Sequence, residues 1–355
     1  MIGLYCPDVP PIPGGVADHT LHLARALERR GIPLAVLARR GDPAGFAPLP
    51  VRMDVTPPGL RTTVRALGLR GLYVQYVPFL YARFGIAPAL PAALAGLRRD
   101  GVTVGLFVHE PYVPFTRLPW LVTGVPQRLQ LRRLVRAAHH VYAATPAFAA
   151  ICRRLARGAD VALAPIGTTI PLSTLSRPDA RRALGLTDGI VAIGVFSPAA
   201  SGYRVDWVRS AMNALAARAD VRWIVFGSGS DRAFPGAPAN VRALGRLPVE
   251  AAADTARALD LFVAPYDDGL SMRRSGAMLG LANALPVVSS TGPLFDPAFT
   301  AYAACEPSAA AFTARVVGLV DDAAARAALA EQARGAAGVA TVDALADRLV
   351  RDLAA

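Results

Sequence analysis

The chain has 355 residues, of which 53% are hydrophobic and 18% are charged. This composition excludes a disordered chain, and the length favours two hydrophobic cores over one. No stretch stays apolar for about 18 residues and no signal-peptide pattern is present, so neither a membrane span nor secretion is expected. Three widely spaced cysteines, Cys6, Cys152 and Cys305, favour buried thiols in a cytoplasmic protein over a disulfide or zinc framework.

The positive charge lies in the first half of the chain. The formal net charge is +12, and every basic residue is arginine. Residues 1–170 hold 20 arginines against eight acidic residues, whereas residues 171–355 hold 18 of each. We therefore expect the first half to face an anionic partner, either a membrane surface, a lipid-linked phosphate or a nucleic acid.

Strands and helices are predicted to alternate along the first half. An amphipathic helix follows residues 13–18 and ends at Gly31, because glycine suits the left-handed conformation that often follows a helix. Further helices are expected at about 127–138 and 146–156. This alternation is typical of a doubly wound α/β domain. The predicted strands are residues 2–6, 33–38, 71–76, 102–108, 140–144 and 160–164.

A turn-rich linker at residues 165–186 separates a second α/β series from the first. We place a first domain at 1–170, a second domain at 171–335 and a C-terminal helix at 336–355 that packs back on the first domain. The fold predicted is α/β, with two tandem Rossmann-like domains facing each other across a cleft. Strands are expected at 190–196, 221–226, 241–246, 261–264 and 286–289, helices at 205–219, 250–259 and 275–284, and a tail at 309–353 that is helical throughout.

The loop between the strand at 261–264 and the helix at 275–284 is the most informative stretch. Asp267 and Asp268 are adjacent carboxylates, Arg273 and Arg274 are adjacent guanidinium groups, and Ser275 stands at the helix start. Ligands of parallel sheets bind at the carboxyl ends of strands, and arginines beside a helix N-terminus suit a diphosphate. The alternative is a solvated charged loop that keeps the sheet end soluble.

Six short motifs, in chain order, resemble landmarks of GT-B glycosyltransferases of family 4. The first is Pro-Gly-Gly-Val-Ala-Asp-His-Thr at 13–20, and the last is the segment 265–290, which ends in Ala-Leu-Pro-Val-Val-Ser-Ser. Between them lie Val-Gln-Tyr-Val-Pro at 74–78, Val-His-Glu-Pro at 108–111, Tyr-Ala-Ala-Thr-Pro at 142–146 and Ala-Pro-Ile-Gly at 164–167. The resemblance covers nearly the whole chain.

The resemblance implies that 1–170 is the acceptor-side domain and 171–335 the nucleotide-sugar-binding domain, and it implies roles for particular residues. Gly14 and Gly15 would offer backbone N–H groups to the donor diphosphate, His109 would lie beside the transferred sugar, and Glu110 would meet the acceptor. For His109 it implies positioning rather than base duty, while a strand-end pair satisfied by loop backbone is the alternative. Further donor contacts are implied at Ser197, Arg204, Gly227 and Arg246.

The chain departs from the family's two-glutamate signature, because Ser271 and Leu279 occupy the glutamate positions. Leucine cannot make the ribose contact of the second glutamate, so the stereochemical outcome stays open between retention, which the family implies, and inversion. The sequence instead resembles a variant loop of the form Asp-Gly-x-Ser-x-Arg-Arg. In that variant Asp267 or Asp268, next to Gly269, would contact the sugar, and Asp268 joins His109 and Glu110 as a catalytic candidate. Gly269 and Ser271 would belong to the donor site, and Arg273, Arg274 and Ser275 would supply its phosphate charge.

Metal-dependent transferases hold a divalent ion with an Asp-x-Asp pair, and this chain has none. Arginine charge and a helix N-terminus can stabilise a diphosphate leaving group without an ion, so neither metal nor cofactor is expected. His19 and His22 have a metal-ligand spacing but no third ligand in evidence, and His139 and His140 are read as structural.

The function predicted is a hexosyltransferase that uses a nucleoside-diphosphate sugar and a lipid-linked or otherwise anionic acceptor, in surface polysaccharide or glycoconjugate synthesis. The basic segment 127–136, after Trp120, fits a peripheral contact with the inner face of the cytoplasmic membrane, or else a solvated helix face. No specific nucleic acid is expected. The alternatives are a GT-B sugar-nucleotide epimerase and a non-catalytic scaffold that binds polyanions.

Overall fold

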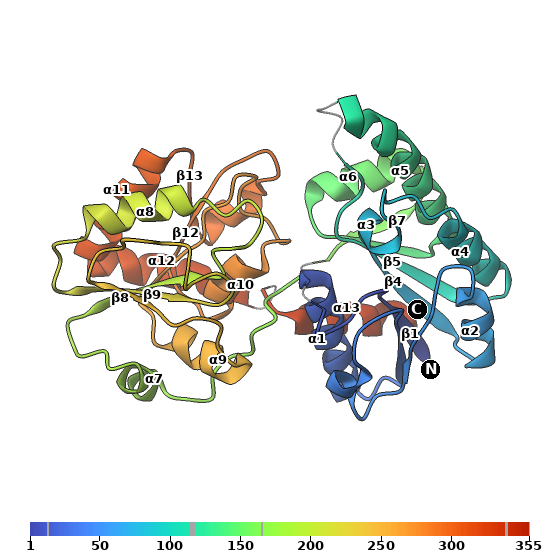
Figure 1. The fold of residues 1–355 in the computed structure, drawn as a ribbon, viewed down its shortest axis with the longest axis horizontal. Helices are drawn as coiled ribbons and strands as arrows, with labels where there is room; N and C mark the ends of the chain where they lie inside the picture. The colour runs from blue at the N-terminus through green and yellow to red at the C-terminus, as the bar shows by residue number, and fades with distance from the viewer. Residues whose placement is uncertain (13, 114–117, 165, 338–339, 355) are drawn as a thin grey trace. The chain divides into compact units, whose positions relative to one another are not determined.

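The computed structural model describes residues 1–12, 14–113, 118–164, 166–337 and 340–354. The chain divides into two compact units (Figure 1). Unit 1 comprises Met1–Pro165 and Val342–Ala355, and unit 2 comprises Ile166–Thr341. Each unit has one parallel sheet with helices between successive strands. The predicted α/β class with two Rossmann-like domains is confirmed.

Unit 1 is built on a seven-stranded sheet of order β3-β2-β1-β4-β5-β6-β7, with all neighbours parallel. Every residue of β1, β2 and β4 is buried, as expected for a parallel sheet covered on both faces. The chain crosses from one side of β1 to the other between β3 and β4. The strands are β1 (Ile2–Tyr5), β2 (Leu34–Leu37), β3 (Val51–Arg52), β4 (Gly71–Tyr76), β5 (Thr103–Val108), β6 (His140–Ala143) and β7 (Asp160–Leu163).

The first helix of unit 1 ends as its sequence predicts. Leu23 and Leu27 are fully buried on its inner face, and Gly31 has a φ of 70° directly after the C-cap Arg30. Helix α4 packs against α5, and α5 packs against α6. The helices of this unit are α1 (Gly15–Arg29), η1 (Pro43–Phe46), α2 (Leu60–Ala66), α3 (Pro78–Tyr81), α4 (Ala89–Arg99), α5 (Leu118–Ala137), α6 (Pro146–Leu155) and α13 (Val342–Ala354).

The C-terminal helix α13 packs against α1 (Figure 1). Leu345 and Leu349 are buried in the core of unit 1, and Arg30 on α1 contacts both Asp343 and Asp347 at 2.7 Å. The prediction that residues 309–353 form one helical tail is wrong. Asp322 interrupts it, because its carboxylate accepts a hydrogen bond from the backbone N–H of Ala325 at 2.9 Å and so starts a new helix.

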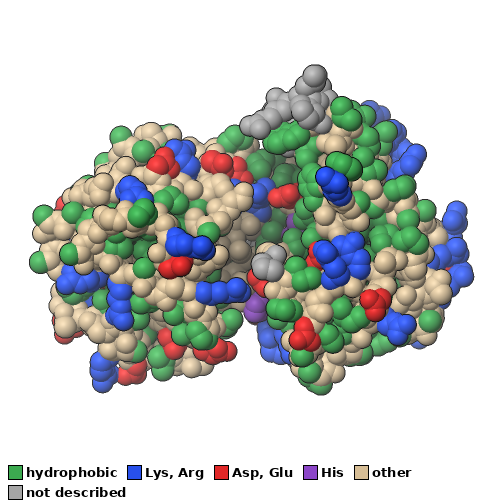
Figure 2. Space-filling model, in the orientation of Figure 1, with side chains coloured by type: hydrophobic (Ala, Val, Ile, Leu, Met, Phe, Trp, Pro, Cys, Tyr) green, Lys and Arg blue, Asp and Glu red, His purple; other side chains and the backbone are tan. Residues whose placement is uncertain are grey.

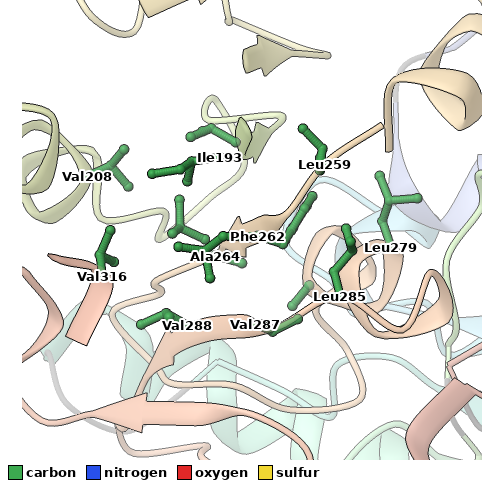
Figure 3. Close-up of a cluster of buried hydrophobic side chains, with 14 of the residues drawn as sticks. Ile193, Val208, Leu259, Phe262, Ala264, Leu279, Leu285, Val287, Val288 and Val316 are labelled. Atoms are coloured by element: carbon green, nitrogen blue, oxygen red, sulfur yellow. The ribbon is translucent and has the colours of Figure 1, made fainter. Parts of the chain in front are cut away.

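Unit 2 has a six-stranded parallel sheet of order β10-β9-β8-β11-β12-β13. Its core lies between the sheet and its helices, with α8 on α11 and α10 on α12 (Figure 3). The strands are β8 (Val191–Phe196), β9 (Val221–Phe226), β10 (Val241–Ala243), β11 (Leu261–Val263), β12 (Val287–Ser290) and β13 (Ala304–Glu306). The helices are α7 (Arg177–Ala183), α8 (Val205–Ala214), α9 (Val249–Arg257), α10 (Ser275–Ala282), η2 (Pro297–Ala301), α11 (Ala309–Asp321) and α12 (Ala323–Ala337).

Several predicted boundaries change. The strand predicted at 241–246 ends at Ala243, and the helix predicted at 205–219 ends at Ala214. The edge strands β3 and β13 were not predicted, because two or three residues are too few for an apolar pattern to emerge.

Candidate functional site

The carboxyl edge of the unit 2 sheet brings together most of the predicted donor-binding residues. Strand β8 lies between β9, which follows it in the chain, and β11, on its other side, so the direction of winding reverses there. Ligands of open α/β sheets bind at such a switch point, outside the carboxyl ends of the strands. Ser197 directly follows β8, Gly227 follows β9, and the loop 267–274 follows β11.

The loops after β8 and β9 approach each other closely. Ser197 has a φ of 49°, and its hydroxyl accepts a hydrogen bond from the backbone N–H of Ser228 at 3.2 Å. A Cβ added to Gly227 would lie 2.5 Å from Ser197 Oγ, and the φ of Gly227 is 86°, so glycine is required there. Gly227 N–H donates to Gly245 O at 2.9 Å, which places exposed Arg246 beside the same loops.

Arg274 is held by its own loop. Its Nε donates to Asp268 Oδ1 at 2.9 Å, and Nη2 pairs with the same carboxylate. Its Nη1 donates to Ser201 O at 2.7 Å, and the guanidinium lies 4.3 Å from the ring centre of Tyr266. With 8% of Arg274 exposed, these contacts tie the loop after β11 to the loop after β8. Its charge is matched within the protein, and a phosphate contact of Arg274 stays a prediction.

The other members of the variant loop divide into surface and core residues. Arg273 is half-buried, with Nη2 3.5 Å from Asp268 Oδ2, and Ser275 begins α10 at the surface side of the loop. Asp267 is exposed at 61% of its side chain and lies 3.7 Å from Arg274 Nη2. Gly269 and Ser271 are buried, so their side of the loop faces the protein interior. Donor contacts from Gly269 and Ser271 stay predictions.

Leu279 and Arg204 make structural contacts within unit 2. Leu279 is fully buried in the core of unit 2, where a glutamate would be desolvated (Figure 3). Arg204 makes two hydrogen bonds to Asp206, at 2.7 and 3.0 Å, and its guanidinium lies 4.8 Å from the ring centre of Trp207. The hydrogen bonds to Asp206 raise the pKa of the Arg204 guanidinium. Arg204 therefore has a structural role in this arrangement, and its donor contact stays a prediction.

Unit 1 holds the other predicted site residues. Gly14 and Gly15 are exposed at the start of α1, and no side chain caps the helix there. An uncapped N-terminus leaves N–H groups available for an anion. His109 follows β5 and is 7% exposed, and its neighbour Glu110 is exposed. Pro13 and Pro165, which belong to the predicted motifs, lie outside the described residues.

Sequence reasoning missed the contact between Gln75 and His109. It lies on β4, is completely buried, and its Oε1 is 2.6 Å from Nε2 of His109. The signal was a lone amide in the apolar strand Gly-Leu-Tyr-Val-Gln-Tyr. Among the described residues, no three His, Cys, Asp or Glu side chains come together as metal ligands. No helix of the described chain is long and apolar enough to cross a membrane.

No family model and no curated protein matches the chain in sequence. Solved structures match it over nearly its full length. A sucrose-phosphate synthase from Thermosynechococcus elongatus has a TM-score of 0.68 at 17% identity, covering 99% of this chain and 98% of that one. WaaG, a glycosyltransferase involved in lipopolysaccharide biosynthesis, gives 0.67 at 14%, covering 99% of both. S. aureus MnaA, solved with UDP, gives 0.63 at 12%, covering 99% and 95%.

Identities this low establish the fold alone, and membership of family 4 with its variant loop stays a prediction. The two parallel sheets, their helices and the coverage of both units agree with these structures. The chain therefore has the GT-B fold of its glycosyltransferase neighbours.

Proposed function

We propose that the protein is a metal-independent glycosyltransferase that moves a sugar, with retention, from a nucleoside-diphosphate sugar to a lipid-linked or otherwise anionic acceptor. In this proposal unit 2 binds the donor and unit 1 the acceptor, in surface polysaccharide or glycoconjugate synthesis. The observation that carries it is the convergence of three loops at the switch point of unit 2. Ser197, Gly227 and the loop of Arg273 meet there.

The donor site is proposed at this edge because it offers charge and close backbone approach. Gly227 lets the loops after β8 and β9 come together, and Arg273 and Ser275 stand at the entrance to α10. A diphosphate leaving group gains negative charge as the sugar bond breaks, and a guanidinium beside it stabilises that charge without a metal ion. We assign phosphate contact to Arg273 and loop positioning to Arg274 and Asp268. In unit 1, His109 and Glu110 are proposed beside the sugar and acceptor, and Gly14 and Gly15 at the diphosphate.

Calorimetric titration with UDP, GDP and ADP in EDTA tests the donor site. One diphosphate is expected to bind, and Arg273→Ala should weaken it by about tenfold or more, the range for a charged hydrogen bond. Arg315→Ala, which removes the ion pair between Arg315 on α11 and Glu306 on β13 of the same unit, is the matched control and should bind normally. Binding that requires magnesium would contradict the metal-independent mechanism.

Other outcomes point to the alternatives. If none of the three diphosphates binds while polyanions bind with a steep salt dependence, the protein is a scaffold. If a nucleotide sugar is converted without any acceptor, the protein is an epimerase.

The anionic partner is proposed at α5 of unit 1. Val122, Val125 and Leu129 are 75%, 50% and 52% exposed, at spacings that place them on one side of the helix. Arg128 and Arg132 are exposed beside them and take part in none of the ion pairs of the described residues. On the face that Figure 2 shows, arginine side chains lie among hydrophobic ones on unit 1. Exposed apolar side chains with a basic rim suit the surface of an anionic bilayer, and we propose a cytoplasmic enzyme that binds the inner membrane face.

Vesicle flotation tests this surface. The protein should float with vesicles that contain anionic lipid and not with neutral ones, and the Leu129→Ser, Arg132→Ser double variant should lose flotation. Leu172→Ser removes a leucine of unit 2 that is 55% exposed and should float normally. Equal flotation with neutral and anionic vesicles contradicts the membrane proposal and leaves the donor site untouched.

A further inference from the structure

Three buried polar side chains lie together near the carboxyl ends of β4 and β5. Gln75 on β4 is 0% exposed, His109 after β5 is 7% exposed, and His19 on α1 is 1% exposed. The polar atoms of side chains buried this deeply normally have hydrogen-bond partners. Here Gln75 Nε2 and both ring nitrogens of His19 have no hydrogen-bond partner among the described residues. An unpaired buried polar atom costs stability, which points to a role other than packing.

Gln75 contacts one of the two rings directly. Its Oε1 lies 2.6 Å from His109 Nε2, and the ring centres of His19 and His109 are 5.0 Å apart at 78°. The amide therefore contacts His109, whose ring packs edge-on against that of His19.

The amide oxygen of Gln75 determines which nitrogen of His109 carries the proton. An amide oxygen only accepts hydrogen bonds, so the 2.6 Å contact requires a proton on Nε2 of His109. In the neutral ring Nδ1 then keeps its lone pair and can accept a hydrogen bond. His109 thus presents a hydrogen-bond acceptor.

The surroundings keep both rings uncharged. Burial first, and the nearby His19 second, lower the pKa of His109 well below its ordinary value. Burial and the charge of His22 lower the pKa of His19 to about 4, against the smaller effect of Gln75. Phe107, whose ring centre is 6.4 Å from that of His19, is the other aromatic neighbour. Both histidines are therefore neutral at physiological pH.

We propose that Gln75 is a positioning residue that locks His109 as the neutral Nε2–H tautomer, so that Nδ1 accepts a hydrogen bond from a hydroxyl group of the transferred sugar. The lock follows from the contact between two residues 34 positions apart in the chain. The sugar hydroxyl as its target rests on the proposed function. His19 packs edge-on against His109, and its neutral ring leaves His109 uncharged.

The lock is tested without any activity measurement, by long-range proton–nitrogen NMR of the full-length, nitrogen-15-labelled protein. His109→Asn assigns the signals of His109 among the five histidines. The wild-type protein should show one neutral tautomer of His109 with the proton on Nε2. Gln75→Leu should give a mixture of tautomers, and the nearly isosteric Gln75→Glu should leave the ring doubly protonated at neutral pH, because a carboxylate replaces the amide.

Gln130→Leu is the matched control. It removes another buried glutamine of unit 1, whose hydrogen bonds go to Ala87, Tyr76 and Gly85, and it should leave the His109 signals unchanged. A wild-type His109 that is protonated on Nδ1, or charged, overturns the lock. So does a Gln75→Glu variant that folds and keeps the wild-type tautomer.

The target of Nδ1 needs a second measurement. Gln75→Leu should weaken binding of the complete nucleotide sugar by about tenfold, the value of one hydrogen bond, and leave binding of the nucleoside diphosphate unchanged. Equal loss for both ligands, or no loss for either, overturns the sugar contact. If no diphosphate binds to the wild-type protein, the proposed function fails, while the NMR result still decides the lock.

Discussion

Gly280 in α10 allows the helix that follows the donor loop to lie close to the sheet. A Cβ at this position would lie 2.8 Å from Cγ and Cδ1 of Phe262 on β11 and 2.9 Å from Cγ2 of Val287 on β12. Both neighbours are fully buried, so neither can move into solvent. Overpacking of this kind costs about 1–3 kcal/mol, while alanine in place of glycine in a helix returns about 1 kcal/mol. Gly280→Ala is therefore expected to cost up to about 2 kcal/mol.

Gly318 in α11 is the matched control, because a Cβ there meets nothing within 4 Å. Gly318→Ala should stabilise unit 2 by about 1 kcal/mol. The two variants should thus differ by about 1–3 kcal/mol in the free energy of unfolding. Because α10 begins at Ser275, the displaced helix in Gly280→Ala should also weaken diphosphate binding, whereas Gly318→Ala should bind as the wild type does.

Urea unfolding followed by tryptophan fluorescence measures the difference. Trp207 and Trp223 are both in unit 2, so a Trp120→Phe background confines the signal to that unit. Equal unfolding free energies for Gly280→Ala and Gly318→Ala would refute the close packing of α10 on the sheet.

Three further predictions concern single side chains. Leu279→Glu, which introduces the glutamate of the signature that the chain lacks, should lower the free energy of unfolding by about 3 kcal/mol or more, because the site is fully buried in an apolar core. A wild-type urea midpoint contradicts this. Tyr142→Phe should lower the free energy of unfolding by about 1 kcal/mol, because the Tyr142 hydroxyl donates a hydrogen bond to Asp352 on α13 at 2.6 Å. Unchanged thermal or urea unfolding would show that α13 is held by its apolar face alone. For His19, the folded pKa of about 4 lies below the unfolded value, so the unfolded chain takes up the proton first. Stability of unit 1 should be full above about pH 6.5 and fall toward about pH 4, by up to about 1.4 kcal/mol per pH unit, and His19→Gln should flatten this slope in pH-dependent unfolding.

The sequence by itself determined the fold class. Apolar runs at 71–76 and 190–196 predicted strands buried on both faces, and the structure has strands there. Gly31 ended the first helix because a residue without a side chain fits a φ of 70°. It also drew attention to the loop 267–274, proposed as the donor loop, and to the excess of arginine in residues 1–170. These features depend on residue type and local spacing, which are present in the one-dimensional pattern.

Only the tertiary structure decided how the polar side chains are used. The sequence predicted that Asp268 contacts the sugar and that Arg274 contacts the phosphate. In the fold the two side chains form an ion pair with each other, and Arg274 stacks on Tyr266. Gln75 meets His109 because β4 and β5 are adjacent in the sheet. Helix α13 returns to unit 1, although the whole of unit 2 separates it from the rest of that unit. Contacts between residues far apart in the chain depend on strand order and burial, and a single sequence does not contain that information.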